Sequence, residues 1–233
     1  MKQKLKIFAT SKYFDLLGVA LVISIAIASG YLATRLDKFV DWGSWTAYVP
    51  FGFISVINVG LSMLSTRFTG KLSKLGNYLG IINAVLSGVI DYILGNKAAI
   101  ITYPVTFLIY LGAIYVWNKS TDKPNILSKT KLYMLVTGIV VVSFVFSYVT
   151  NYIGYKGHMS LLAYITTIAF AFSLVGNGLN IFKLSTQWQF WLLYNIVQFT
   201  KALVQGNFAN VGKYIFYIIN SVGALFVWKD SEE

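Results

Sequence analysis

Long apolar segments alternate with short polar segments along the chain. Eight of them are apolar enough to be predicted as transmembrane helices: residues 13–34, 45–66, 75–95, 98–117, 132–152, 159–182, 187–205 and 210–228. Each has about 18 to 24 residues, the length of helix that spans roughly 30 Å of hydrocarbon. The pattern therefore predicts an all-α integral membrane protein with eight transmembrane helices.

The seventh segment carries a polar stripe on an otherwise apolar helix. Its stretch WQFWLLYNIVQ places four residues within an arc of about 80° on an ideal helix: Trp188, Trp191, Asn195 and Gln198. Indoles stack on flat heteroaromatic rings, and amides match the donors and acceptors of a ribose or a carboxamide. The alternatives are an aromatic belt at the membrane interface and hydrogen bonding between helices. We interpret the stripe as one wall of a solute-binding site.

Composition and charge fit a membrane protein. Hydrophobic residues make up 57% of the chain and charged residues only 12%, which is atypical of soluble domains. The net charge is +11, and thirteen of the 19 basic residues fall on the same side of the predicted helices as the N-terminus. This bias predicts that both termini are cytoplasmic and that the basic residues contact anionic lipid rather than nucleic acid. The first apolar segment is too long for the core of a signal peptide, so a retained helix is expected.

Two parts of the chain resemble each other. KLSKLGNYLGIINAVL, residues 71–86, aligns with KLSTQWQFWLLYNIVQ, residues 183–198, at an offset of 112. Further along, an offset of 111 aligns Tyr103 with Tyr214, and it also aligns two tryptophans that each close an apolar segment, Trp117 and Trp228. The ordered matches predict a repeat of three helices.

The repeat defines the expected arrangement of the chain, 1–233, as one transmembrane domain. A first triplet, 45–117, and a second triplet, 159–228, are separated by the single helix 132–152 and preceded by an extra helix, 13–34. Three helices plus one separator make an even number of crossings, so the two triplets are parallel and related by an axis along the membrane normal. This 1+3+1+3 order is a SWEET-like plan. Transporters with such repeats bind their substrate between the halves.

Further candidate binding residues lie on two other helices. Asn83 is the repeat mate of Asn195, so the symmetry predicts that both amides face the central axis. The last helix contributes hydroxyl and amide groups that can hydrogen-bond a sugar: Tyr214, Tyr217 and Asn220. The full set of expected substrate-binding residues is Asn83, Trp188, Trp191, Asn195, Gln198, Tyr214, Tyr217 and Asn220.

Ionisable residues lie near the predicted ends of the spans rather than in their middles. Lys201 and Lys213 are expected to extend outward to the membrane surface, and no titratable group for proton coupling is expected on the solute pathway. The chain has no cysteine, no phosphate-binding loop, no nucleophile motif and no cluster of metal ligands. We therefore expect a protein that is not an enzyme and that uses neither a cofactor nor a metal.

The helix plan and the seventh-helix motif resemble the PnuC family of bacterial transporters of vitamin-like compounds. The resemblance covers most of the chain beyond residue 45, and its most specific element is the Trp-x-x-Trp motif, Trp188 to Trp191, followed by Asn195. It implies a homotrimer in the bacterial cytoplasmic membrane with one binding site in each protomer. It also implies facilitated diffusion of a nucleoside-like solute, with nicotinamide riboside first, and trapping of that solute by phosphorylation in the cell.

Other substrates and other classes of function stay open. Thiamine, riboflavin and deoxynucleosides are alternatives, because TYPVTFLIY, residues 102–110, departs from the Tyr-Tyr-x-Pro-Met-Gln pattern of the nicotinamide riboside type. The first triplet also lacks a Trp-x-x-Trp counterpart. A vitamin-binding subunit of an ATP-driven importer is an alternative of another class. A membrane enzyme needs a nucleophile or metal site that the sequence does not offer, and paired indoles fit a heteroaromatic ring better than the hexose of a SWEET-type carrier.

Overall fold

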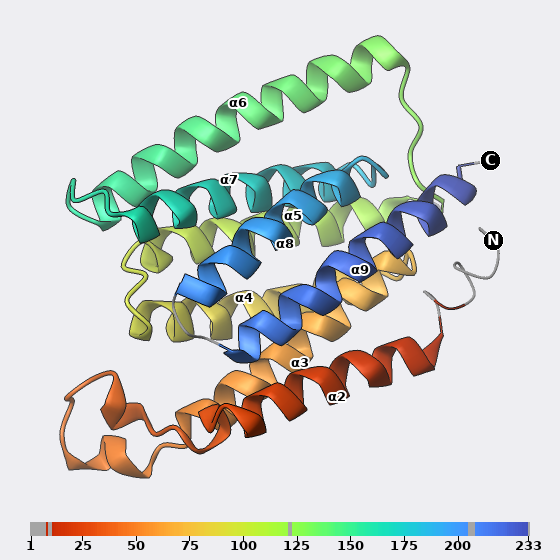
Figure 1. Ribbon diagram of the computed structural model, residues 1–233. Coiled ribbons are helices and arrows are strands. Elements are labelled where there is room, and N and C mark those ends of the chain that lie inside the picture. The colour runs from red at the N-terminus through yellow and green to blue at the C-terminus, as the bar shows by residue number, and fades with distance from the viewer. Residues whose placement is uncertain (1–7, 9–10, 121–122, 205–207, 233) are drawn as a thin grey trace.

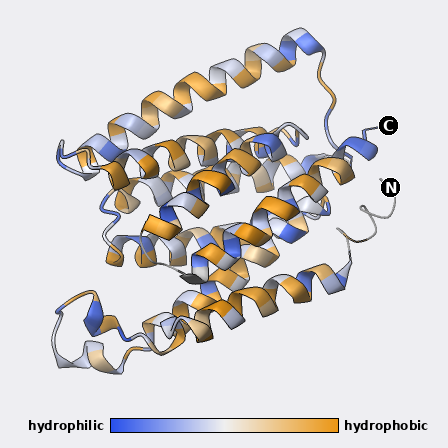
Figure 2. Cartoon of the chain, in the orientation of Figure 1, coloured by the Kyte–Doolittle hydropathy of each residue, from blue (hydrophilic) through white to orange (hydrophobic). Residues whose placement is uncertain are grey.

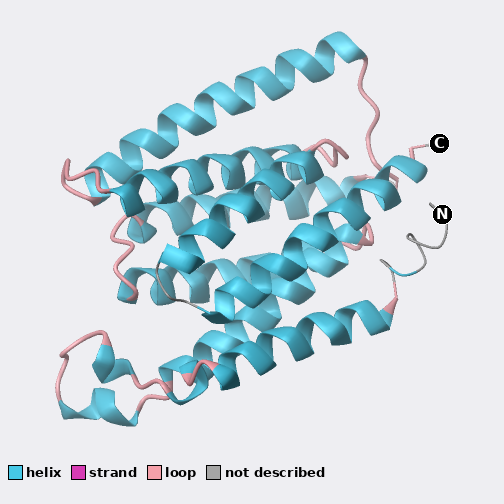
Figure 3. Ribbon diagram, in the orientation of Figure 1, coloured by secondary structure: helices cyan, strands magenta, loops and turns pink. Residues whose placement is uncertain are grey.

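The computed structural model describes residues 8, 11–120, 123–204 and 208–232, and its regular secondary structure is helical (Figure 1). Within these residues there is no β-strand, as Figure 3 shows. The long helices are α2 (Lys12–Ala28), α3 (Phe51–Gly70), α4 (Leu75–Ile93), α5 (Ala99–Lys119), α6 (Lys129–Gly154), α7 (Leu161–Ile181), α8 (Gln187–Val204) and α9 (Phe208–Asp230). The predictions of an all-α protein and of eight long helices are confirmed.

The first two helices are shorter than predicted at the ends that face each other. α2 ends at Ala28, because Gly30 adopts φ of 70°, a left-handed conformation that commonly terminates a helix. α3 begins only after Pro50, whose ring has no backbone N–H and is readily accommodated at a helix start. Three short 3-10 helices occupy the connection: η1 (Tyr31–Ala33), η2 (Leu36–Lys38) and η3 (Ser44–Tyr48).

Five of the described helices are long and apolar enough to cross a membrane. They are α3, α5, α6, α7 and the Asn210–Asp230 part of α9. α2 has 17 residues, and α4 and α8 carry polar residues within their spans. Figure 2 shows hydrophobic residues along most of the helices and hydrophilic residues gathered mainly at helix ends and connections. The other three long helices, α2, α4 and α8, therefore differ from these five in length or in the polar side chains they carry.

The helices pack as two groups of three with two additional helices at the periphery (Figure 1). α4 packs between α3 and α5, and α8 packs between α7 and α9. The groups meet along two seams, α3 against α9 and α5 against α7. α2 lies on α9 and α3, while α6 lies on α7. We call the end at which α2 begins and α9 ends the termini end, and the opposite end the far end.

Candidate substrate cavity

A cavity of about 150 Å³ lies between the two groups of helices. α3, α4, α5, α7, α8 and α9 all contribute lining side chains, most of which carry an amide, a hydroxyl or an aromatic ring. Six of the eight predicted binding residues line it: Asn83, Trp191, Asn195, Gln198, Tyr214 and Tyr217. The structure thus brings side chains from α4, α8 and α9 together around one space.

The polar stripe of α8 forms one wall of this cavity. The ring of Trp191 lies against α7 at Gly176, where an added Cβ would come within 2.8 Å of Trp191 Cε2. Tyr194 meets Trp191 edge to face, with ring centroids 5.3 Å apart. Gln198 Nε2 donates to the Tyr194 hydroxyl at 3.0 Å. A residue without a side chain at 176 therefore allows the indole to lie close to the α7 backbone beside the cavity.

Asn195 has one side-chain atom engaged and one without a partner. Its Nδ2 donates to Ser221 Oγ at 3.0 Å and to the carbonyl of Tyr217 at 3.3 Å. Its Oδ1 is buried and has no hydrogen-bond donor among the described residues. A buried acceptor without a donor is costly, so a donor from a bound solute is a natural partner for this oxygen.

Asn83 lies across the cavity on α4, and it is held differently from its repeat mate. Its Nδ2 donates to Asn58 Oδ1 at 2.9 Å and to the Asn58 carbonyl at 3.2 Å, while Asn58 Nδ2 donates to Ser87 Oγ at 2.9 Å. These bonds run from α4 to α3, whereas those of Asn195 run from α8 to α9. Both amides line the same cavity, but they are anchored on opposite neighbours.

Several tyrosines complete the lining. Tyr217 donates its hydroxyl to Ser62 Oγ at 2.8 Å and so links α9 to α3. Tyr103, Tyr110 and Tyr194 also line the cavity and were not among the predicted residues. Two of the three had a signal in the sequence: Tyr194 lies beside the α8 stripe, about 40° from Gln198 on an ideal helix, and Tyr103 is the repeat mate of Tyr214.

Two predicted binding residues lie outside the cavity lining, toward the termini end. Trp188 is 1% exposed and packs edge to face against Trp228, with ring centroids 6.0 Å apart. Asn220 is fully buried, and its Oδ1 accepts a hydrogen bond from Arg67 Nη1 at 2.6 Å. Position on the helix explains the difference for the Trp-x-x-Trp pair: Trp188 is one turn nearer the termini end than Trp191, and there the helices close together.

The expectation that Lys201 and Lys213 extend outward is wrong, because both line the cavity near its far end. Lys201 is 6% exposed, and its Nζ lies 4.0 Å from Asp91 Oδ2 on α4. The same carboxylate oxygen accepts a hydrogen bond from the Tyr103 hydroxyl at 2.8 Å. On an ideal helix Lys201 lies about 60° beyond Gln198, outside the 80° stripe, so the cavity extends over a wider face of α8 than the stripe predicted. The expectation of a pathway without ionisable groups is wrong for the same reason.

Comparison with known proteins places the chain in a family. The model of the nicotinamide mononucleotide transporter family matches residues 52–230. The chain belongs to this family. A crystal structure described as the vitamin B3 transporter PnuC is similar in fold, with a TM-score of 0.68 and 17% sequence identity over 94% of this chain and 92% of that one. No curated protein matches the sequence.

Family membership confirms the broad predictions from the sequence. The protein is a multi-pass membrane transporter of the PnuC type and not an enzyme. The matched region begins at the start of α3 and therefore leaves α2 outside it. The cavity described above lies within the matched region, apart from Tyr31.

In this transporter the seams between the helix groups are closed at the termini end by a pair of similar hydrogen bonds. Trp117 Nε1 donates to the carbonyl of Asn180 at 2.8 Å, across the α5 and α7 seam. Trp228 Nε1 donates to the carbonyl of Thr69 at 3.3 Å, across the α9 and α3 seam. The donors are 111 residues apart, and so are the acceptors. Trp228 packs against both Trp117 and Trp188, with ring centroids 5.8 and 6.0 Å apart, and the three rings belong to one buried cluster at the termini end.

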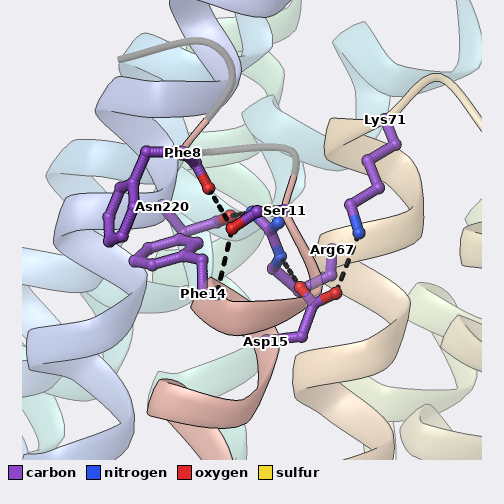
Figure 4. A network of polar contacts seen from close by, with 7 residues as sticks. All are labelled: Phe8, Ser11, Phe14, Asp15, Arg67, Lys71 and Asn220. Atoms are coloured by element: carbon purple, nitrogen blue, oxygen red, sulfur yellow. Dashed lines mark hydrogen bonds and ion pairs between the residues drawn. The ribbon is translucent and has the colours of Figure 1, made fainter. Parts of the chain in front are cut away.

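A charged network reinforces the same end of the transporter (Figure 4). Arg67 of α3 is 4% exposed and donates from Nε to Asp15 of α2, in addition to its bond to Asn220 of α9. Lys71 Nζ lies 2.9 Å from the other Asp15 oxygen. The Arg67 guanidinium also lies 4.7 Å from the ring centroid of Phe14. One arginine thus connects three helices, two of which belong to different groups.

Proposed function

We propose that the protein lets a nucleoside-like vitamin precursor cross the membrane by facilitated diffusion. Nicotinamide riboside is the first candidate, and only the family resemblance supports this choice. The observation that carries the proposal is the cavity wall of α8, where an indole and an unpartnered amide oxygen lie side by side in a transporter of this family. Deoxynucleosides, thiamine and riboflavin are the other candidates.

The proposed binding mode assigns the ring of the solute to Trp191. A flat heteroaromatic ring stacks on indole, and a cationic ring gains additional attraction. The Asn195 Oδ1 atom, with no donor among the described residues, accepts from an amide or hydroxyl of the solute, and Gln198 and Asn83 supply further polar contacts. Trp188 and Asn220 are left out of this set because they lie outside the cavity lining, toward the termini end.

We also propose that the helix groups are parallel repeats in a 1+3+1+3 plan, with residues 45–117 and 159–228 as the repeat units. The two indole bonds support this, since their donors and acceptors share an offset of 111. Leu72 and Lys183 support it too, because both adopt positive φ just beyond the ends of α3 and α7, again at an offset of 111. Transport then proceeds by rocking of one group against the other around the cavity.

The remaining parts of the proposal concern cell and assembly. The excess of basic residues at the termini end supports a cytoplasmic location for both termini in a bacterial plasma membrane. The family resemblance supports a homotrimer and trapping of the solute by intracellular phosphorylation.

Flux measurements with purified protein in liposomes test this function. Uptake of nicotinamide riboside, thiamine, riboflavin and a set of deoxynucleosides is measured without ATP, with and without a proton gradient. We expect the protein to take up one of these solutes until its concentrations inside and outside are equal. We expect Trp191→Ala and Asn195→Ala each to abolish this uptake. Trp45→Ala is the matched control, because Trp45 is exposed at the far end. Accumulation against a gradient, or a need for ATP, contradicts the mechanism, and no loss in the two variants contradicts the site.

A further inference from the structure

A groove lies beside α6, over the seam between α5 and α7. It has a volume of about 550 Å³. Its lining runs along α6 from Met134 to Phe146 and includes Ile109 of α5 and Leu174 of α7. Of the described lining residues, only Ser143 has a polar side chain. The groove is therefore an apolar surface to which helices of both groups contribute.

The other seam between the groups is covered more tightly, by α2. An added Cβ at Gly18 of α2 would clash with Met63 of α3 and Phe216 of α9, so α2 lies directly against both groups. An added Cβ at Gly138 of α6 meets no described atom within 4 Å. Apolar side chains beside such a gap lose dispersion contacts unless another apolar molecule supplies them. The space beside α6 thus suits an apolar ligand from the membrane.

A lysine lies at the termini end of the groove, on the face of α6 that lines it. Lys131 precedes the lining by one turn and is exposed, and on an ideal helix it falls about 20° from both Gly138 and Val142. Lys129 falls about 160° from Lys131 and so lies on the opposite face. Residues 119–131 contain four lysines and one aspartate, a net charge of +3. The groove therefore has a positively charged entrance at one end only.

We infer that this groove binds an acyl chain of an anionic phospholipid, with the lipid headgroup at Lys131. The lining from Met134 to Phe146 covers about 18 Å of the helix axis, close to one leaflet of a hydrocarbon core of roughly 30 Å. Side chains on a helix lean toward its N-terminus, so the Lys131 stem extends toward the membrane surface, where a headgroup lies. Basic side chains between transmembrane helices are suited to such headgroups. The site is separate from the substrate cavity and does not depend on which solute is transported.

Lipid binding to the purified protein tests the charge at the entrance. Native mass spectrometry measures dissociation constants for phosphatidylglycerol and phosphatidylcholine with identical acyl chains. We expect phosphatidylglycerol to bind about fivefold tighter, because one lysine near the surface contributes about 1 kcal/mol toward an anionic lipid. Lys131→Gln removes this preference, whereas the matched control Lys129→Gln retains it. Equal affinities for the two lipids in the natural protein, or equal losses in the two variants, overturn the inference.

A second pair of variants tests the position of the acyl chain. Gly138→Leu places a side chain in the open space of the groove. We expect it to weaken binding of both lipids by about tenfold or more, because several CH₂ groups lose their buried contacts. Thr137→Leu is the control, because Thr137 is exposed on α6 and does not line the groove.

The same spectra distinguish a lipid from a second copy of the chain. If Gly138→Leu changes the mass of the oligomer and Thr137→Leu does not, a neighbouring protomer covers the groove, and the inference is overturned. Unchanged lipid binding in Gly138→Leu overturns it as well. The lysine comparison decides the question if Gly138→Leu does not fold.

Discussion

The two ends of the cavity are closed by different kinds of interaction. At the termini end, three packed indoles, two indole-to-carbonyl bonds and a buried arginine join helices from both groups. At the far end, an ion pair between Lys201 of α8 and Asp91 of α4 links the two groups, with 4.0 Å between its atoms. Removal of a buried, hydrogen-bonded group is costly, whereas an ion pair at 4.0 Å without a hydrogen bond holds its helices together less strongly. The far end is therefore the one that opens more easily from the conformation described.

The largest effect is expected from breaking the arginine network at the termini end. Arg67→Met removes the hydrogen bonds that the buried guanidinium donates to Asp15 and Asn220, and each hydrogen bond to a charged group contributes about 1.5 to 3 kcal/mol. Thermal unfolding in detergent measures the loss. Lys71→Met is the control, since Lys71 is partly exposed and its pair with Asp15 contributes about 1 kcal/mol or less. Equal losses in the two variants contradict a special role for Arg67.

A smaller effect is expected when an indole bond at a seam is removed. Trp228→Phe leaves the Thr69 carbonyl without this donor, which costs about 1 to 3 kcal/mol when the group is buried. The natural chain has no cysteine, so a single Ala224→Cys change provides a reporter beside the indoles. We expect faster labelling of Cys by a water-soluble maleimide in the Phe variant. Trp45→Phe is the control, because that indole bonds at an exposed site, and equal labelling rates count against the seam as a closure.

At the α8 wall, we expect a substitution to lower the affinity for the solute without a large change in stability. In Gly176→Ala the new Cβ would come within 2.8 Å of Trp191, so the indole must shift away from α7 into the cavity. We expect the affinity for the transported solute to fall about tenfold, which corresponds to about 1.4 kcal/mol. Gly138→Ala on α6 is the control, because a Cβ there meets no atom within 4 Å. Unchanged affinity in Gly176→Ala shows that the solute does not rest on this indole.

The smallest effect on stability is expected at the far end. Asp91→Asn removes the charge that faces Lys201 but retains a side chain of nearly the same shape. We expect a smaller change in thermal unfolding than in Arg67→Met, because Lys201 and Asp91 are 4.0 Å apart and share no hydrogen bond, whereas Arg67 donates hydrogen bonds to both Asp15 and Asn220. A loss as large as that of Arg67→Met shows that both ends are closed with comparable strength, which contradicts the contrast drawn above.

Much of the fold and part of the site could be predicted from the sequence. The apolar segments gave the number and order of helices, because a helix in lipid must be long and apolar. The α8 stripe placed Trp191, Asn195 and Gln198 on the cavity side, because helical periodicity is a local property. The same periodicity placed Trp188 there as well, and it could not show that the neighbouring helices close around that ring.

The sequence by itself determined the helical membrane fold, the family and the polar face of α8. Only the tertiary structure decided which side chains on that face meet a cavity and which meet another helix. Lys201 shows the physical reason: its direction depends on a carboxylate on α4, 110 residues earlier in the chain. Periodicity fixes the face of a helix on which a residue lies, whereas burial, partners and charge balance depend on the helices that pack against that face.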